Sequence, residues 1–288
     1  ALLGLSVAGI MTGVTTLIAD YYTGQTRANF MGLQAAFMGL GGVVFLSVGG
    51  FIADLNWRFP FLIYLSAWAI LIAIALTIYE PERKILNQTS SSAIKPTMPI
   101  GVLAMIYGVA WFYMVAFYLI PVQLPFYLQN LSNASATASG LAIAASTLAS
   151  AIASLRYGFV KERLGFVSIV VIAFGVAAVG YLIIGIAGSY NVVLIGLIIA
   201  GLGFGLLMPN LNVWLSSIIP DVLRGRALGG LTTFFFLGQF LSPLVSQPIT
   251  NEIGLAKTYS FTGVCLLIVA IAFLSFRKQI NSFCQNCY

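Results

Sequence analysis

Histidine is absent from the sequence, and charged side chains are scarce. Only 7% of the 288 residues are Asp, Glu, Lys or Arg, whereas a soluble domain carries about 25%. The lack of His excludes a His-based metal site and a His general base. Hydrophobic residues make up 60% of the chain, which is more apolar sequence than a globular core can hide. Lipid must therefore be the solvent for most of this protein.

Cysteine is also rare. The last two of the three thiols, Cys284 and Cys287, have C-x-x-C spacing in a short polar tail. A zinc site needs four ligands, so we expect reduced spectator thiols, no metal and no cofactor. The net charge of +6 does not indicate nucleic-acid binding, because the basic residues fall singly or in pairs between apolar runs.

Apolar runs of about 20 residues predict nine helical spans across a lipid bilayer. They cover residues 2–19, 29–53, 60–79, 99–128, 136–156, 166–187, 191–214, 227–250 and 256–276. The one long polar connection is residues 80–97, which divides the chain into three spans (1–79) and six spans (98–276), followed by a tail (277–288).

Lysine and arginine predict the orientation. Eleven of the 13 basic residues fall on one side, and only Arg58 and Lys257 fall on the other. The positive-inside rule places the 80–97 linker and the C-terminal tail in the cytoplasm, with the spans in the plasma (inner) membrane. The chain opens at Ala1 directly in an apolar run, so we expect it to start inside a longer protein with three further spans in front.

A weak internal repeat supports six spans plus six. "RANFMGL" at 27–33 and "RGRALGG" at 224–230 follow corresponding spans, with Arg27 matching Arg224 and Gly32 matching Gly229. Repeats of this kind are typical of transporters whose binding site lies between two halves.

Four segments resemble the major facilitator superfamily, within it the drug and metabolite antiporters. They are the loop "GFVKERLGF" at 158–166, a glycine series in the second span, "YLIPVQLPFYLQ" at 118–129 with the small-residue span after it, and "PDVLRGRALGG" at 220–230 with "FLGQFLSP" at 236–243. The resemblance implies an all-α membrane protein of the major facilitator fold, with an incomplete N-terminal bundle and a complete six-helix C-terminal bundle.

The loop at 158–166 resembles a family motif in which an acid and a base latch one conformer. Glu162 replaces the usual Asp, and Phe166 replaces a basic residue. An ordinary charged loop that fixes topology is the alternative. The residues that the resemblance assigns to the latch are Gly158, Glu162, Arg163, Gly165, Arg27, Asp221 and Arg224.

The glycine series resembles the antiporter motif G-x8-G-x3-G-P-x2-G-G, but Phe45-Leu46 replaces its Gly-Pro pair. Simple helix packing and an antiporter signature both remain open. The series consists of Gly32, Gly41, Gly49 and Gly50.

Neutral amides are the polar groups deep in the predicted spans, because every Asp and Glu sits at a span end or in a loop. A coupling carboxylate for protons is therefore expected outside this sequence. We expect Gln123, Asn210 and Gln239 to face one cavity, and interhelical hydrogen bonds are the alternative. The predicted substrate-binding residues are Gln34, Gln123, Asn210, Trp214, Phe235 and Gln239.

These features predict a secondary transporter that works by alternating access, not an enzyme. The expected partners are a small organic substrate, a coupling proton and the bilayer, and the expected state is a monomer. Export of a drug or metabolite is the first hypothesis. An uptake symporter, or a non-transporting receptor or scaffold of the same fold, is the alternative.

Overall fold

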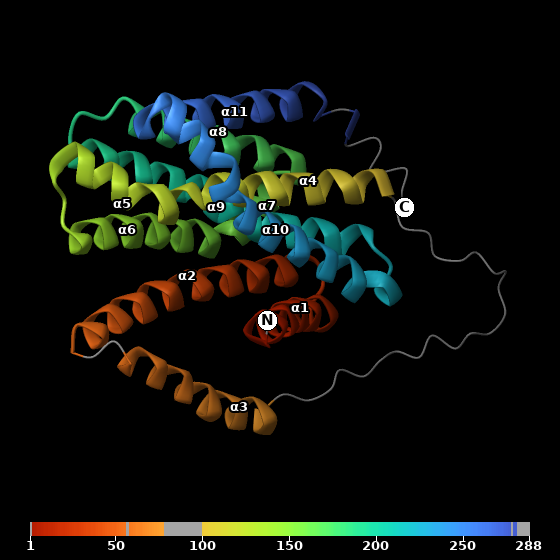
Figure 1. Ribbon diagram of the computed structural model, residues 1–288. Coiled ribbons are helices and arrows are strands. Elements are labelled where there is room, and N and C mark those ends of the chain that lie inside the picture. Colours follow the sequence, from red (N-terminus) through yellow and green to blue (C-terminus); the bar gives the residue numbers. More distant parts are fainter. Residues whose placement is uncertain (1, 56–57, 78–99, 278, 281–288) are drawn as a thin grey trace, which may run out of the picture.

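The computed structural model describes residues 2–55, 58–77, 100–277 and 279–280 (Figure 1). Within these ranges the chain is helical and contains no strand. The predicted linker at 80–97 and the Cys284/Cys287 pair lie outside the described residues. Seven described helical segments are long and apolar enough to cross a membrane.

The helices form an N-terminal group and a C-terminal group, which lies above it in Figure 1. The N-terminal group consists of α1 (Leu2–Tyr21), α2 (Gly24–Leu55), the 3-10 helix η1 (Phe59–Leu65) and α3 (Ser66–Thr77). The C-terminal group consists of α4 (Ile100–Phe117), α5 (Leu119–Ser132), α6 (Ala136–Leu155), α7 (Tyr157–Arg163), α8 (Phe166–Gly185), α9 (Tyr190–Ile218), α10 (Asp221–Ile253) and α11 (Leu255–Ser275).

The predicted span at 99–128 is interrupted at Tyr118, between α4 and α5. Pro121 has no backbone N–H to donate to the carbonyl of Phe117, so the hydrogen-bond ladder is interrupted there. Tyr118 keeps an α-type backbone (φ −73°, ψ −7°), and its N–H still bonds the Met114 carbonyl at 3.0 Å. The span is therefore two helical pieces with a joint between them.

The segment after α6 is helical, whereas the sequence led us to expect a loop. The Val160 and Leu164 amides bond the carbonyls of Arg156 and Val160, at 3.1 and 3.0 Å. Lys161 and Arg163 occupy the last turn of α7, where positive charge stabilises the helix dipole. The connection between the two predicted spans therefore contains a short helix, which the sequence did not predict.

Small residues set the close packing of the C-terminal group, where α9 lies against α6 and α8. A Cβ at Gly205 would collide with the carbonyl of Ser150 on α6. The Ser154 hydroxyl donates to the Gly205 carbonyl at 2.6 Å. Close approach of this kind adds van der Waals contacts and buried hydrogen bonds. These stabilise the helix pair, because the hydrophobic effect does not drive helices together within lipid.

The internal repeat predicted from "RANFMGL" and "RGRALGG" is visible in the helix boundaries. The step along the sequence that carries Arg27 to Arg224 also carries Gly24, the start of α2, to Asp221, the start of α10. The same step along the sequence makes η1 and α3 together correspond to α11. The two segments therefore fold as corresponding units.

Candidate functional site

The two groups of helices meet where α2 packs on α6 and α1 packs on α10. Gly32 lets the backbones of α2 and α6 approach closely, because a Cβ there would collide with the carbonyl of Ser154 on α6. Gly39, further along α2, would bring a Cβ within 3.3 Å of the Ala151 Cβ. No neighbour lies within 4 Å of a Cβ built at Gly41. Gly49 and Gly50 lie near the end of α2, which extends to Leu55.

Arg27 is buried at the start of α2 and is surrounded by carbonyls. Its guanidinium donates to Tyr22 O at 2.8 Å, to Ala19 O at 2.8 Å and to Ser216 O at 3.2 Å. Ala19 and Ser216 lie in the last turns of α1 and α9, where the helix dipole is negative. Arg27 therefore links the C-terminal ends of two helices from different groups.

Arg224 makes the corresponding contact from α10. Its Nη1 donates to Ala19 O at 3.3 Å and pairs with the Asp20 carboxylate at 2.8 Å. The Arg224 side chain is 8% exposed, and that of Asp20 is 38% exposed. Asp221 begins α10 one turn earlier. A half-buried ion pair of this kind is held by its hydrogen bonds as much as by charge.

Gly158 joins the same interface from α7. Its carbonyl accepts a 2.6 Å hydrogen bond from Gln25 Nε2 on α2. A Cβ at position 158 would overlap the Asn29 amide oxygen. A larger residue at position 158 would therefore displace the Asn29 side chain, where α7 touches α2.

The remaining residues of the predicted latch lie apart from this contact. Glu162 and Arg163 are exposed, and Arg163 stacks over the Phe159 ring at 4.3 Å. No side chain or backbone lies within 4 Å of a Cβ built at Gly165, which precedes α8. Nearby, Lys161 Nζ lies 3.9 Å above the Phe166 ring, and partial burial lowers the pKa of Lys161.

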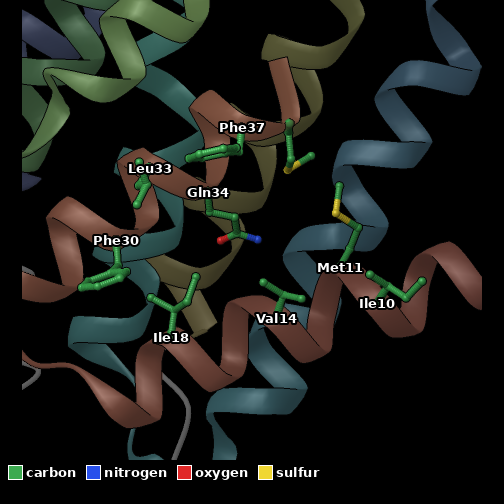
Figure 2. A pocket seen from close by; sticks show the side chains of 9 residues that line it. Ile10, Met11, Val14, Ile18, Phe30, Leu33, Gln34 and Phe37 are labelled. Carbon is green, nitrogen blue, oxygen red and sulfur yellow. The ribbon is translucent and has the colours of Figure 1, made fainter. Parts of the chain in front are cut away.

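A groove of about 470 Å³ runs between α1 and α2, and Figure 2 shows the side chains that line it. Its lining is apolar except for one amide, Gln34. The groove is lined by Ile10, Met11, Val14, Ile18, Phe30, Leu33, Gln34, Phe37 and Met38. The Gln34 amide points into the space between the two helices and donates to Thr15 Oγ1 at 3.2 Å. An apolar cleft with one orienting polar group suits an amphipathic organic molecule.

Gln123 lies outside this groove, on α5. Its amide is 3% exposed and donates to Ser246 Oγ at 3.4 Å and to Gln247 Oε1 at 3.0 Å. Gln247 in turn donates to Asn251 at 3.3 Å. These amides tie α5 to the second half of α10.

Asn210 has a different set of partners. It is fully buried, accepts from the Tyr157 hydroxyl at 3.3 Å and donates to the Phe166 carbonyl at 3.1 Å. Trp214, one turn later, is 1% exposed and stacks on the Phe166 ring at 5.6 Å with a 2° interplanar angle. Gln123 and Asn210 therefore share no partner, and their hydrogen bonds are the interhelical kind that the sequence left as an alternative.

Phe235 and Gln239 lie one turn apart on α10. Phe235 is buried and meets Tyr113 of α4 edge to face, with ring centroids 6.1 Å apart. Gln239 is half-buried next to it. Tyr107 of α4 stacks on Phe234 of α10, with ring centroids 4.9 Å apart, where the two helices pack together.

Sequence reasoning missed three contributors: Thr15, Asp20 and Gln25. Asp20 carried a weak signal, as an acid at the end of a span, but its partner Arg224 lies far away in the sequence. Thr15, inside α1, and Gln25, at the start of α2, carried none, since single neutral polar residues are common in such helices. Within the described ranges, no three His, Cys, Asp or Glu residues lie close enough to hold a metal ion.

Comparison with known proteins agrees with this architecture. The Major Facilitator Superfamily profile matches residues 1–130 and 106–282. Multidrug resistance protein 1 of Bacillus subtilis is 28% identical, over 92% of this chain and 69% of the relative. Quinolone resistance protein NorA of Staphylococcus aureus is 25% identical, over 98% of this chain and 74% of the relative.

Two solved structures share the fold. The human organic anion transporter MFSD10 (TETRAN) superposes with a TM-score of 0.80 at 18% identity, covering 92% of this chain and 68% of that one. The proton:xylose symporter XylE superposes with a TM-score of 0.67 at 15% identity, covering 92% and 66%. With its family profile matched along nearly the whole sequence, the chain belongs to the Major Facilitator Superfamily and is a multi-pass membrane transport protein.

Proposed function

We propose that this protein exports an amphipathic organic compound, such as a drug, by proton-coupled antiport with alternating access. The observation that carries the proposal is the groove at Gln34, an apolar cleft with one amide, in a chain similar to two drug-resistance proteins. The chain matches 69% and 74% of those relatives, so the activity of the whole protein is part of the proposal.

The groove supplies the chemistry needed for a lipophilic substrate. Burying apolar surface contributes about 25 cal/mol per Å². A glutamine amide has two N–H donors and one acceptor oxygen, and Thr15 takes one donor. The second donor and the oxygen are available to orient a polar group on the substrate. Because Gln34 is polar but uncharged, the groove would select substrates by shape and amphipathic character rather than by net charge.

The contacts of Arg27, Arg224 and Gly158 form the proposed latch. Each joins the N-terminal group to the C-terminal group, at the end that the Lys/Arg distribution assigns to the cytoplasm. Alternating access requires such contacts in one conformer and their loss in the other. In this proposal they stabilise the conformer that is closed on the cytoplasmic side.

Uptake by symport is the second candidate, because the fold is shared with a proton:xylose symporter as well as with an organic anion transporter. Export by antiport and uptake by symport differ in whether the solute moves against or with the coupled ion, and the same fold supports both. A receptor or scaffold that transports nothing is the third candidate, and the groove argues only against a scaffold that binds no ligand.

Reconstitution in liposomes tests the proposal. In liposomes that contain the protein with its cytoplasmic side facing outward, proton-coupled efflux would move a quinolone into an acidic lumen. Collapse of the pH gradient should stop this accumulation. Xylose serves as the control for sugar symport. Movement of the solute in the same direction as the protons, rather than in exchange for them, would indicate symport instead of antiport. Binding without transport under either polarity would leave the receptor or scaffold as the surviving function.

The proposed orientation has its own test. Single cysteines at positions 90 and 160, in a variant lacking the native thiols, should react with an impermeant maleimide only after the membrane is opened. Labelling of either position in intact cells would contradict a cytoplasmic linker and a cytoplasmic α7.

A further inference from the structure

One face of α6 and α7 is apolar along most of its length and cationic at one end. Leu148, Ile152 and Leu155 of α6 are 45%, 49% and 50% exposed. The opposite side of α6 is occupied, because Ser154 bonds Gly205 of α9 and Ala151 contacts α2. The stripe is therefore not part of the protein core.

Two arginines and a phenylalanine continue this face beyond the end of α6. Arg156 keeps an α-type backbone (φ −86°, ψ −2°), so the helical rotation carries on into α7. Arg156, Phe159 and Arg163 then follow at helical spacing, and all three are exposed, Phe159 by 53%. Together, Leu148, Ile152, Leu155, Arg156, Phe159 and Arg163 form what we term the α6–α7 face.

The arginines have no acidic partner on this face. Within residues 100–277, neither Arg156 nor Arg163 forms an ion pair, although Glu162, the residue before Arg163, is exposed nearby. The Arg163 Cζ lies over the Phe159 ring, 4.3 Å from its centroid. A cation–π contact of this kind helps to hold the guanidinium in place, and no ion pair within residues 100–277 uses its N–H donors.

We propose that the α6–α7 face binds one anionic phospholipid. The phosphate bridges Arg156 and Arg163, and an acyl chain lies along Leu148, Ile152 and Leu155. Arginine pairs bind phosphate with bidentate, charge-assisted hydrogen bonds. The apolar stripe is the width of a helix face and lies in hydrocarbon, where an acyl chain is the ordinary neighbour. The basic end then meets the anionic headgroup at the membrane surface.

Charge favours lipid over a second copy of this chain. Two copies packed through the α6–α7 face would bring Arg156 and Arg163 of one copy near those of the other at the same membrane depth, which is repulsive. An anionic headgroup supplies the missing negative charge. The inference does not depend on what the protein transports.

The test measures lipid retained by the purified protein. The protein is placed in nanodiscs of mixed phosphatidylcholine and phosphatidylglycerol, extracted in detergent, and its bound lipid is analysed by native mass spectrometry. The wild-type protein is expected to retain one phosphatidylglycerol, and the R156Q/R163Q variant is expected to lose it. Arg226→Gln is the matched control, because Arg226 is an exposed arginine on α10 with no stacked ring, and it should retain the lipid.

Further arms separate the alternatives. Phe159→Leu keeps both charges but removes the stacking surface, and should lower retention several-fold; it also provides a result if the double variant does not insert. If the wild type, the R156Q/R163Q variant and the Phe159→Leu variant retain equal amounts of phosphatidylglycerol, the proposed site is wrong. Displacement of the lipid by inorganic phosphate alone shows an anion site rather than a lipid site and overturns the proposal as stated. A dimer in place of bound lipid would assign the face to a second copy.

Discussion

Arg27 and Arg224 make reciprocal contacts across the two groups of helices. Arg27 donates to the Ser216 carbonyl at the end of α9, at 3.2 Å, and Arg224 donates to the Ala19 carbonyl at the end of α1, at 3.3 Å. The step from Arg27 to Arg224 along the sequence equals the step from Ala19 to Ser216, so the internal repeat relates the two contacts. Each arginine stabilises the negative end of a helix that belongs to the other group.

Disruption of the Arg224–Asp20 pair should shift the conformational equilibrium. We expect Arg224→Gln and Asp20→Asn each to favour the conformer in which α1 and α10 separate, with a coupling energy of about 0.5–3 kcal/mol between them. Double electron–electron resonance between spin labels on α1 and α10 measures the populations. Arg226→Gln should change nothing. Strictly additive effects would show that the ion pair is not part of the latch.

Replacing Gly32 with Ala should force α2 away from α6. The new Cβ would collide with the Ser154 backbone carbonyl, which has no rotamer to escape into. Overpacking of this kind costs about 1–3 kcal/mol. Thermal unfolding in detergent, followed by tryptophan fluorescence, measures the loss. Gly41→Ala is the control on the same helix, since its Cβ meets no neighbour within 4 Å, and it should be neutral or slightly stabilising.

Gln34→Leu tests recognition in the groove between α1 and α2. The substitution keeps the volume but removes the amide, so we expect substrates with a polar group to lose affinity by about 1 kcal/mol, roughly fivefold, and purely apolar ones to keep it. Competition binding with a fluorescent amphipathic probe distinguishes the two. Thr15→Val leaves the Gln34 amide in place and should have a smaller effect. Equal losses for all ligands would indicate a packing defect instead.

Asn210→Ala should lower stability without changing selectivity. Its side chain satisfies the Tyr157 hydroxyl and the Phe166 carbonyl in a buried setting, and leaving such groups unpaired costs about 1–3 kcal/mol. Tyr157→Phe should be less damaging alone and should reduce the additional cost of Asn210→Ala. The melting temperature and the relative affinities of several substrates form the readout. Altered substrate preference at unchanged stability would return Asn210 to the binding site.

The fold and the repeat could be predicted from sequence because both depend on local patterns. Apolar length alone predicts a spanning helix, since a backbone in hydrocarbon must satisfy its own hydrogen bonds. Pro121 lies close to the joint between α4 and α5, and Arg27 and Arg224 mark equivalent positions in the two repeat units. Helix α7 was missed because seven residues carry too few periods to distinguish a short helix from a turn.

The sequence by itself determined that this is a helical membrane protein with an internal repeat, and which few polar groups it places in an apolar chain. Only the tertiary structure decided what those groups do. Gln123 and Asn210 found partners on neighbouring helices, whereas Gln34 faces an open groove. The physical reason is that an amide without a hydrogen-bond partner costs free energy in an apolar setting at each of these positions, so the sequence alone does not reveal the partner. Whether that cost is met by a neighbouring helix or left to a ligand depends on helix approach and rotation, which are set by packing between residues far apart in the chain.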